Sequence, residues 1–168
     1  MSSEFPPLFE TCQPRNDVLD GSLQEDQFAA SLATVAHDPN KAAPNYREAS
    51  LFFEMTYPTE GLKTLLSNLT GRFLASGTNQ ETDYTSSILC LDTRFGGGKT
   101  HDLIASYHLA EHADDISNLS DHLLPDDESS AEAYDEAVEE GLSVDSAVFV
   151  GGHVDARNAR SDRRDPNA

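Results

Sequence analysis

The chain has 168 residues, of which 38% are hydrophobic and 24% are charged. This length and composition are typical of one globular domain with a core, and they exclude a fully disordered protein. The 30 acidic and 11 basic residues give a formal net charge of -19, which argues against binding to nucleic acid or to an anionic membrane.

The excess of acidic residues has two physical interpretations. It can form an acidic tail or a surface that repels nucleic acid, or it can adapt a protein to concentrated salt, where screening weakens self-repulsion. The acids are spread along the chain, because residues 1–98 hold 13 acids and 6 bases while residues 99–168 hold 17 and 5. This spread favours adaptation to salt in a halophilic cytoplasm.

Several signals place the chain in the cytoplasm. The first ten residues have neither a basic start nor an apolar core, so we expect no secretory signal. No apolar run approaches the roughly 18 residues that a membrane span needs. Cys12 and Cys90 lie far apart without a partner pattern, which indicates free thiols in a reducing compartment. We expect a soluble protein with no membrane partner.

The N-terminal half is expected to be helical. Residues 1–21 are rich in proline and are predicted to be an extended lead-in, followed by a helical region over residues 22–83. Ser22 and Glu25 have the spacing of a capping box at the start of the first helix. The inner face of that helix is then expected to carry Phe28, Leu32 and Val35.

Two further segments complete this helical region. Residues 46–57 form an apolar-rich segment, and Pro58 ends it and starts the next helix. That helix has the clearest periodicity in the chain, with a single apolar stripe at the helical spacing of i, i+3 and i+4. The stripe consists of Leu62, Leu65, Leu66, Leu69 and Phe73.

Two short apolar runs, at residues 88–91 and 147–150, are typical of strands buried on both faces of a parallel sheet. Between them lies a predicted helix over about residues 99–112, with Leu103, Ile104 and Tyr107 facing inward. A right-handed crossover would place both strands in one sheet. The sequence therefore predicts an α/β fold, in which a P-loop NTPase-like strand–loop–helix–strand unit over residues 84–154 forms a partial parallel sheet.

The C-terminal third is strongly acidic. Residues 114–145 contain 12 acids and no lysine or arginine, and form a predicted acidic insert. Within this insert, residues 130–140 are expected to form a solvated helix. Residues 155–168 show no periodicity and are expected to be a disordered tail. A group of arginines in this tail could contact DNA phosphates, but the acids between them weaken that interpretation. These arginines are Arg157, Arg160, Arg163 and Arg164.

Three glycines followed by Lys-Thr carry the strongest chemical signal in the chain. Glycines permit the tight turn in which backbone N–H groups cradle phosphate oxygens at the start of a helix, and Gly96, Gly97 and Gly98 supply it. Lys99 is expected to reach the β- and γ-phosphates, and Thr100 to complete the shell of a magnesium ion. The sequence therefore predicts binding of ATP, or of a closely related triphosphate, with Mg2+. The alternative is a glycine-rich turn that carries Lys-Thr without binding anything.

Other polar residues near this loop have weaker signals. The full G-x-x-x-x-G-K-[ST] pattern has a glycine where this chain has Thr93, so the turn leaving the first run must differ. His101 is expected either to contact the nucleotide or to pack on the helix. His108 and His112 have a spacing compatible with metal ligands, but no third ligand is evident. Asp92 is better suited to a turn than to catalysis.

Three stretches of the chain resemble a family of large AAA+ ATPases that is known mainly as a domain of unknown function. The stretches are residues 14–30, residues 56–62, and Leu91 to His101, which includes the string Phe-Gly-Gly-Gly-Lys-Thr-His. Members of that family occur in bacteria and archaea, often beside DNA methyltransferase and helicase genes in suspected anti-phage islands. The resemblance covers roughly residues 10–112, and it implies that Thr93 is a family trait.

The resemblance also implies groups that this chain does not offer. ATP hydrolysis needs an acidic strand end and usually an arginine finger, whereas the second apolar run is followed by Gly151-Gly152. We therefore expect an N-terminal fragment of an AAA+-like ATPase that binds nucleotide but is not active alone. Its expected partners are the remainder of the ATPase or other subunits.

Two alternatives remain open. The chain can be a non-catalytic remnant whose acidic segment binds another protein. It can also be a small kinase, which the absence of arginine between residues 101 and 156 disfavours.

Overall fold

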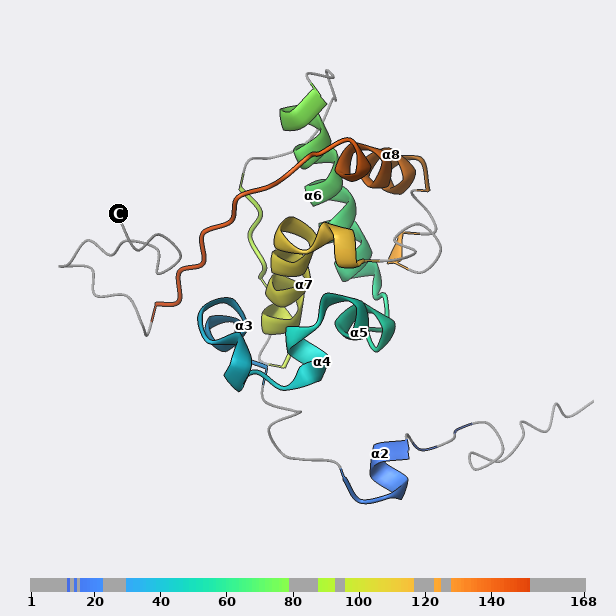
Figure 1. The fold of residues 1–168 in the computed structure, drawn as a ribbon, viewed down its shortest axis with the longest axis vertical. Helices are drawn as coiled ribbons and strands as arrows, with labels where there is room; N and C mark the ends of the chain where they lie inside the picture. Colours follow the sequence, from blue (N-terminus) through green and yellow to red (C-terminus); the bar gives the residue numbers. More distant parts are fainter. Residues whose placement is uncertain are drawn as a thin grey trace, which may run out of the picture.

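The computed structural model describes residues 12, 14, 16–22, 30–78, 88–92, 96–116, 123–124 and 128–151, and these residues form a helical assembly (Figure 1). The longest helix, α6, packs against both α7 and α8, while α3 and α5 contact α7. In chain order the helices are α2 (Asn16–Leu19), α3 (Leu32–His37), the 3-10 helix η2 (Pro39–Lys41), α4 (Pro44–Arg47), α5 (Ala49–Glu54), α6 (Glu60–Thr78), α7 (Lys99–Glu111), the 3-10 helix η3 (Ala113–Asp115) and α8 (Glu128–Glu139).

The predicted α/β fold is wrong, because the described part of the chain contains no strand and no sheet. Residues 88–92 and 142–150 lack helical structure, but neither segment forms a ladder with another described segment. Residues 88–90 are exposed, whereas a strand inside a parallel sheet is buried on both faces. An apolar run becomes a strand only when a neighbour satisfies its backbone N–H and C=O groups, and here the helices form the core instead.

The segment after α8 nevertheless packs against the helices through one of its faces. From Gly141 to Val150, exposed and half-buried residues alternate strictly, and Leu142 and Val148 pack against the helical core. Ser146 donates two hydrogen bonds to Glu111 Oε1 at the end of α7, one from its backbone N–H at 3.0 Å and one from its hydroxyl. The apolar run that predicted a strand over residues 147–150 is therefore packed on one face only, as part of a single segment.

The stripe predicted on α6 is confirmed. Leu62, Leu65 and Leu66 are buried, and Leu69 and Phe73 are half-buried against the same core. The helix begins at Glu60, two residues after Pro58. On α7, Ile104 and Tyr107 face inward as expected, but Leu103 is 44% exposed. His108, for which no inward position was predicted, is fully buried.

The helix start differs from the expected capping box. Ser22 is exposed and lies outside any helix, and Glu25 falls outside the described residues. The N-cap of α3 is Ser31, whose hydroxyl accepts a hydrogen bond from the Thr34 backbone N–H at 3.3 Å. A serine at this position satisfies a helix N–H group that would otherwise have no partner. The lead-in expected to be extended contains one helical turn, α2.

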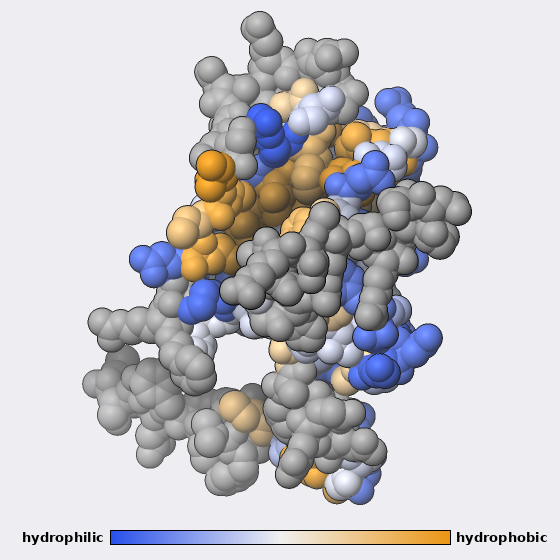
Figure 2. Space-filling model, turned by 90° about the vertical axis from the view of Figure 1, so that its left-hand side faces the viewer, coloured by the Kyte–Doolittle hydropathy of each residue, from blue (hydrophilic) through white to orange (hydrophobic). Residues whose placement is uncertain are grey.

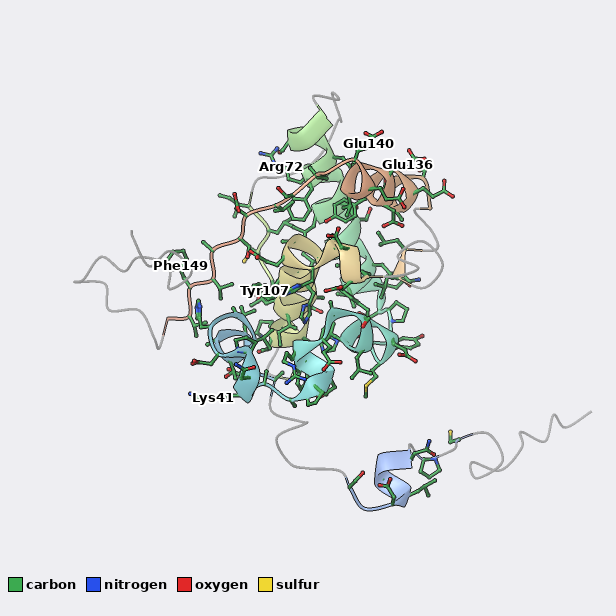
Figure 3. All side chains as sticks on the ribbon, in the orientation of Figure 1. Lys41, Arg72, Tyr107, Glu136, Glu140 and Phe149 are labelled. Atoms are coloured by element: carbon green, nitrogen blue, oxygen red, sulfur yellow. The ribbon has the colours of Figure 1, made fainter. Side chains whose placement is uncertain are left out.

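The helix expected over residues 130–140 is α8, and it is solvated on one face only. Ala131, Tyr134 and Ala137 are buried against the core. The Tyr134 hydroxyl donates a hydrogen bond of 2.7 Å to the carbonyl oxygen of Leu109 on α7. Figure 3 shows Glu136 and Glu140 at the outer edge of this helix, where both are exposed.

Apolar side chains gather on the face that Figure 2 shows. In Figure 1 the segments 88–92 and 142–150 run along this side of the molecule, and they include the exposed residues Ile88, Leu89 and Phe149. None of the described helices is long and apolar enough to cross a membrane. The arginines of the predicted tail lie outside the described residues.

Candidate nucleotide-binding site

The predicted phosphate-binding loop is a glycine turn that leads into α7. Gly96 and Gly98 both have φ of +80°, in the left-handed region that glycine adopts most readily. Gly98 is also the N-cap of α7. All three glycines are exposed to solvent. The sequence therefore has glycine where the backbone needs it, and the turn is accessible to a ligand.

The first turn of α7 presents N–H groups without a side-chain cap. Gly98 has no side chain to cap them, and its carbonyl oxygen already accepts the N–H of Asp102 at 2.9 Å. Lys99 is the first residue of the helix and is half-buried, while Thr100 is exposed. Uncapped N–H groups at a helix start, together with the helix dipole, form an environment that favours an anion.

An acidic side chain lies close to this turn. Oδ1 of Asp102 is 3.9 Å from the point where a Cβ on Gly98 would lie. Burial raises the pKa of Asp102, and the neighbouring His101 opposes that shift. A carboxylate in the first turn of a helix complements the dipole, so it competes with an incoming anion for the same positive field. An anion that arrives with a metal cation is less affected by this competition.

His101 connects the loop to α5. Its Nε2 is 3.0 Å from the Thr56 hydroxyl, and its ring lies 4.5 Å from the Phe52 ring, centroid to centroid. Thr56 is buried just after the C-cap of α5 and donates its own hydroxyl hydrogen to the Phe52 carbonyl oxygen at 2.6 Å. A hydroxyl has one hydrogen to donate, so His101 must carry a hydrogen on Nε2 and donate it to Thr56.

His108 and His112 have no third metal ligand beside them among the described residues. The described residues contain no group of three or more His, Cys, Asp or Glu side chains that could hold a metal ion. His108 Nε2 lies 2.8 Å from the carbonyl oxygen of Tyr46, and burial lowers the pKa of His108 from its ordinary value of 6.5 to about 4. Nδ1 of His112 is 3.9 Å from a carboxylate oxygen of Asp115. His108 is therefore a neutral core residue.

The predicted site residues are brought together at one end of one helix. Gly96, Gly97, Gly98, Lys99, Thr100 and His101 are all described, whereas Thr93 is not. Asp92 is exposed at the end of the segment 88–92. Sequence reasoning missed the contacts of Thr56 and Phe52 with His101. A signal was present in the sequence, because Thr56 lies in one of the three stretches on which the predicted family resemblance rests.

A known protein family matches most of the chain. A family model described as the DUF499 N-terminal domain matches residues 8–156, and the chain belongs to this family, which is a domain of unknown function. The match spans both Thr56 and the glycine turn. No curated protein and no solved structure matches the chain.

Proposed function

We propose that the chain binds ATP, or a closely related nucleoside triphosphate, together with Mg2+ at the loop Gly96 to Thr100. One observation carries the proposal: two left-handed glycines lead directly into the uncapped start of α7, whose first two residues are Lys99 and Thr100. Phosphate oxygens would accept from the N–H groups of this turn, and Lys99 would neutralise part of their charge. The Thr100 hydroxyl would bind the metal ion, whose charge offsets that of Asp102.

On the resemblance to AAA+ ATPases we further infer that this nucleotide site serves a large ATPase, of the kind found in suspected anti-phage islands. The glycine string that carries the resemblance is the same string that forms the turn. The remainder of such an ATPase, or its partner subunits, would supply the groups that position water and stabilise the transferred phosphoryl group.

Calorimetry with ATP and Mg2+ on wild type and Lys99→Ala tests the proposal. A charge-assisted hydrogen bond contributes about 1.5–3 kcal/mol, so Lys99→Ala should weaken binding by roughly tenfold to a hundredfold. Lys41→Ala is the matched control, because Lys41 is exposed on η2 (Figure 3) and should leave the affinity unchanged. Equal affinity of wild type and Lys99→Ala would contradict the assignment.

The alternative of an acidic interaction protein gives a different result. In that case calorimetry would detect no binding of ATP with Mg2+ to wild type or to either variant. Binding would instead depend on the exposed acids of α8 and its C-terminal end, which include Glu132, Glu136, Glu139 and Glu140.

A further inference from the structure

The first turn of α7 is held from the side rather than by a cap. Its N-cap Gly98 offers no side-chain hydrogen bond. The N–H groups at a helix start have no partner within the helix, so an uncapped first turn frays easily. In this protein the third residue of the helix, His101, is fixed instead by contacts with another helix.

Those contacts come from the end of α5, which lies beside the loop end of α7 (Figure 1). Thr56 is tied to α5 twice, because its N–H donates to the Phe53 carbonyl oxygen at 3.1 Å and its hydroxyl donates to that of Phe52. The Phe52 ring lies close to two histidines of α7, 4.5 Å from the ring of His101 and 5.3 Å from that of His108. The acceptor for His101 is therefore itself immobilised.

We propose that Thr56 and His101 are positioning residues for the phosphate loop. The hydrogen bond from His101 Nε2 to the Thr56 hydroxyl holds the first turn of α7 in the orientation in which its N–H groups meet a triphosphate. This inference rests on the proposed nucleotide binding, and it adds that the affinity of the loop depends on a residue 45 positions before His101 in the chain. It also makes α5 the element that a bound nucleotide would stabilise.

The test compares variants that differ only in the hydrogen bond. Thr56→Val removes the hydroxyl at nearly constant volume, whereas Thr56→Ser keeps it. His101→Leu removes the donor, whereas His101→Gln keeps an amide N–H near the position of Nε2. Thr70→Val is the structural control, because Thr70 is also buried and donates its hydroxyl to a helix carbonyl, that of Ser67, but lies on α6.

The full chain is titrated with ATP and Mg2+. We expect Thr56→Val and His101→Leu each to weaken binding about fivefold to tenfold, with Thr56→Ser and His101→Gln within about twofold of wild type. Thr70→Val should destabilise the fold and bind ATP normally. Combining Thr56→Val with His101→Leu should cost no more than either alone, since both remove the same hydrogen bond.

A second measurement separates this inference from the nucleotide assignment. In the nucleotide-free protein, hydrogen exchange at the amide of Asp102, whose N–H donates to the Gly98 carbonyl oxygen and closes the first turn of α7, should be faster in Thr56→Val than in Thr56→Ser or Thr70→Val. If wild type binds ATP in a Lys99-dependent way and Thr56→Val binds equally well, the positioning role is wrong and the nucleotide site stands. If exchange responds as expected but wild type does not bind ATP, the nucleotide assignment is wrong, and the positioning role falls with it.

Discussion

His108 on α7 and Tyr46 on α4 are joined by a hydrogen bond of 2.8 Å between the imidazole Nε2 and the backbone carbonyl oxygen. The imidazole is fully buried, and its Nδ1 has no hydrogen-bond partner among the described residues. Since Nε2 must donate to the carbonyl, the neutral form carries its lone pair on Nδ1. A proton added there would create a buried charge with nothing to accept its hydrogen.

The stability of the protein should therefore fall as the solution becomes acidic. The pKa of His108 is about 4 in the folded state and about 6.5 when unfolded, so the unfolded chain takes up the proton first as the pH drops. The contribution of His108 is fully present above pH 6.5 and is lost between pH 6.5 and about 4. The loss is on the order of 3 kcal/mol.

Urea unfolding of wild type and His108→Gln over this pH range measures the effect, because glutamine keeps an N–H donor and cannot be protonated. Carboxylates titrate in the same range, so the decisive quantity is the difference between the two proteins. Parallel pH profiles for wild type and His108→Gln would contradict the prediction.

Replacing Gly98, the N-cap of α7, or Gly71, inside α6, with alanine should change the stability of the fold in opposite directions. Gly98 has a φ of +80°, so Gly98→Ala should destabilise the fold by about 1–2 kcal/mol through backbone strain alone, since the nearest atom to the new Cβ is 3.9 Å away. Gly71 lies inside α6 without positive φ and with no atom within 4 Å of a new Cβ. Gly71→Ala should stabilise by about 0.5–1 kcal/mol. Thermal unfolding of both variants checks this, and a stable Gly98→Ala would show that the turn is not left-handed.

The attachment of α8 should depend on one hydroxyl group. Tyr134→Phe removes the hydrogen bond to the Leu109 carbonyl and should lower the free energy of unfolding by about 1 kcal/mol. Tyr134→Ala also empties a buried ring site and should cost about 3–5 kcal/mol. Glu132→Ala, at an exposed position of the same helix, is the control. Denaturation by urea gives the three values, and a neutral Tyr134→Phe would mean that the hydroxyl is solvated in the folded protein.

Salt should stabilise the fold. A chain with a formal charge of -19 repels itself, and salt shortens the Debye length from about 10 Å at 0.1 M to about 3 Å at 1 M. We expect the melting temperature to rise between low and molar KCl. Replacing Glu132, Glu136 and Glu139 on the exposed face of α8 with glutamine should reduce this rise. A flat or falling melting temperature would argue against adaptation to salt.

Helical periodicity predicted the buried stripe of α6 correctly, but α3 starts after Ser31 rather than at Ser22, and apolar runs predicted the sheet wrongly. The α6 stripe needs no partner to be recognised, because i, i+3 and i+4 positions share a face of any helix. The runs at 88–91 and 147–150 could form a sheet only by pairing with neighbouring strands. A local sequence pattern does not contain that non-local pairing. Leu103 and His108 show the same limit on a small scale, because hydropathy alone assigned the inner face of α7.

The sequence predicted the residues of the candidate loop, but not the contact with Thr56 that holds His101. The glycine string is local in sequence, so Gly96 to His101 could be identified without a fold. The contact between His101 and Thr56 joins residues 45 positions apart, and no short pattern encodes such a pair.

The hydrogen bonds from Ser146 to Glu111 have a consequence for how this protein can vary in length. They close residues 112–145 into a loop whose two ends are pinned at the same point of α7. The entropy cost of closing a flexible loop grows slowly, by about 0.6 kcal/mol for each doubling of its length. Insertions in this acidic stretch, outside α8 and away from the buried Leu123 and Leu124 and from Ala113, Ile116 and Leu142 that pack on the core, should therefore leave the helical core nearly unchanged. This makes the stretch a suitable place to graft an affinity tag or a fluorescent reporter without disturbing the glycine turn at the opposite end of α7.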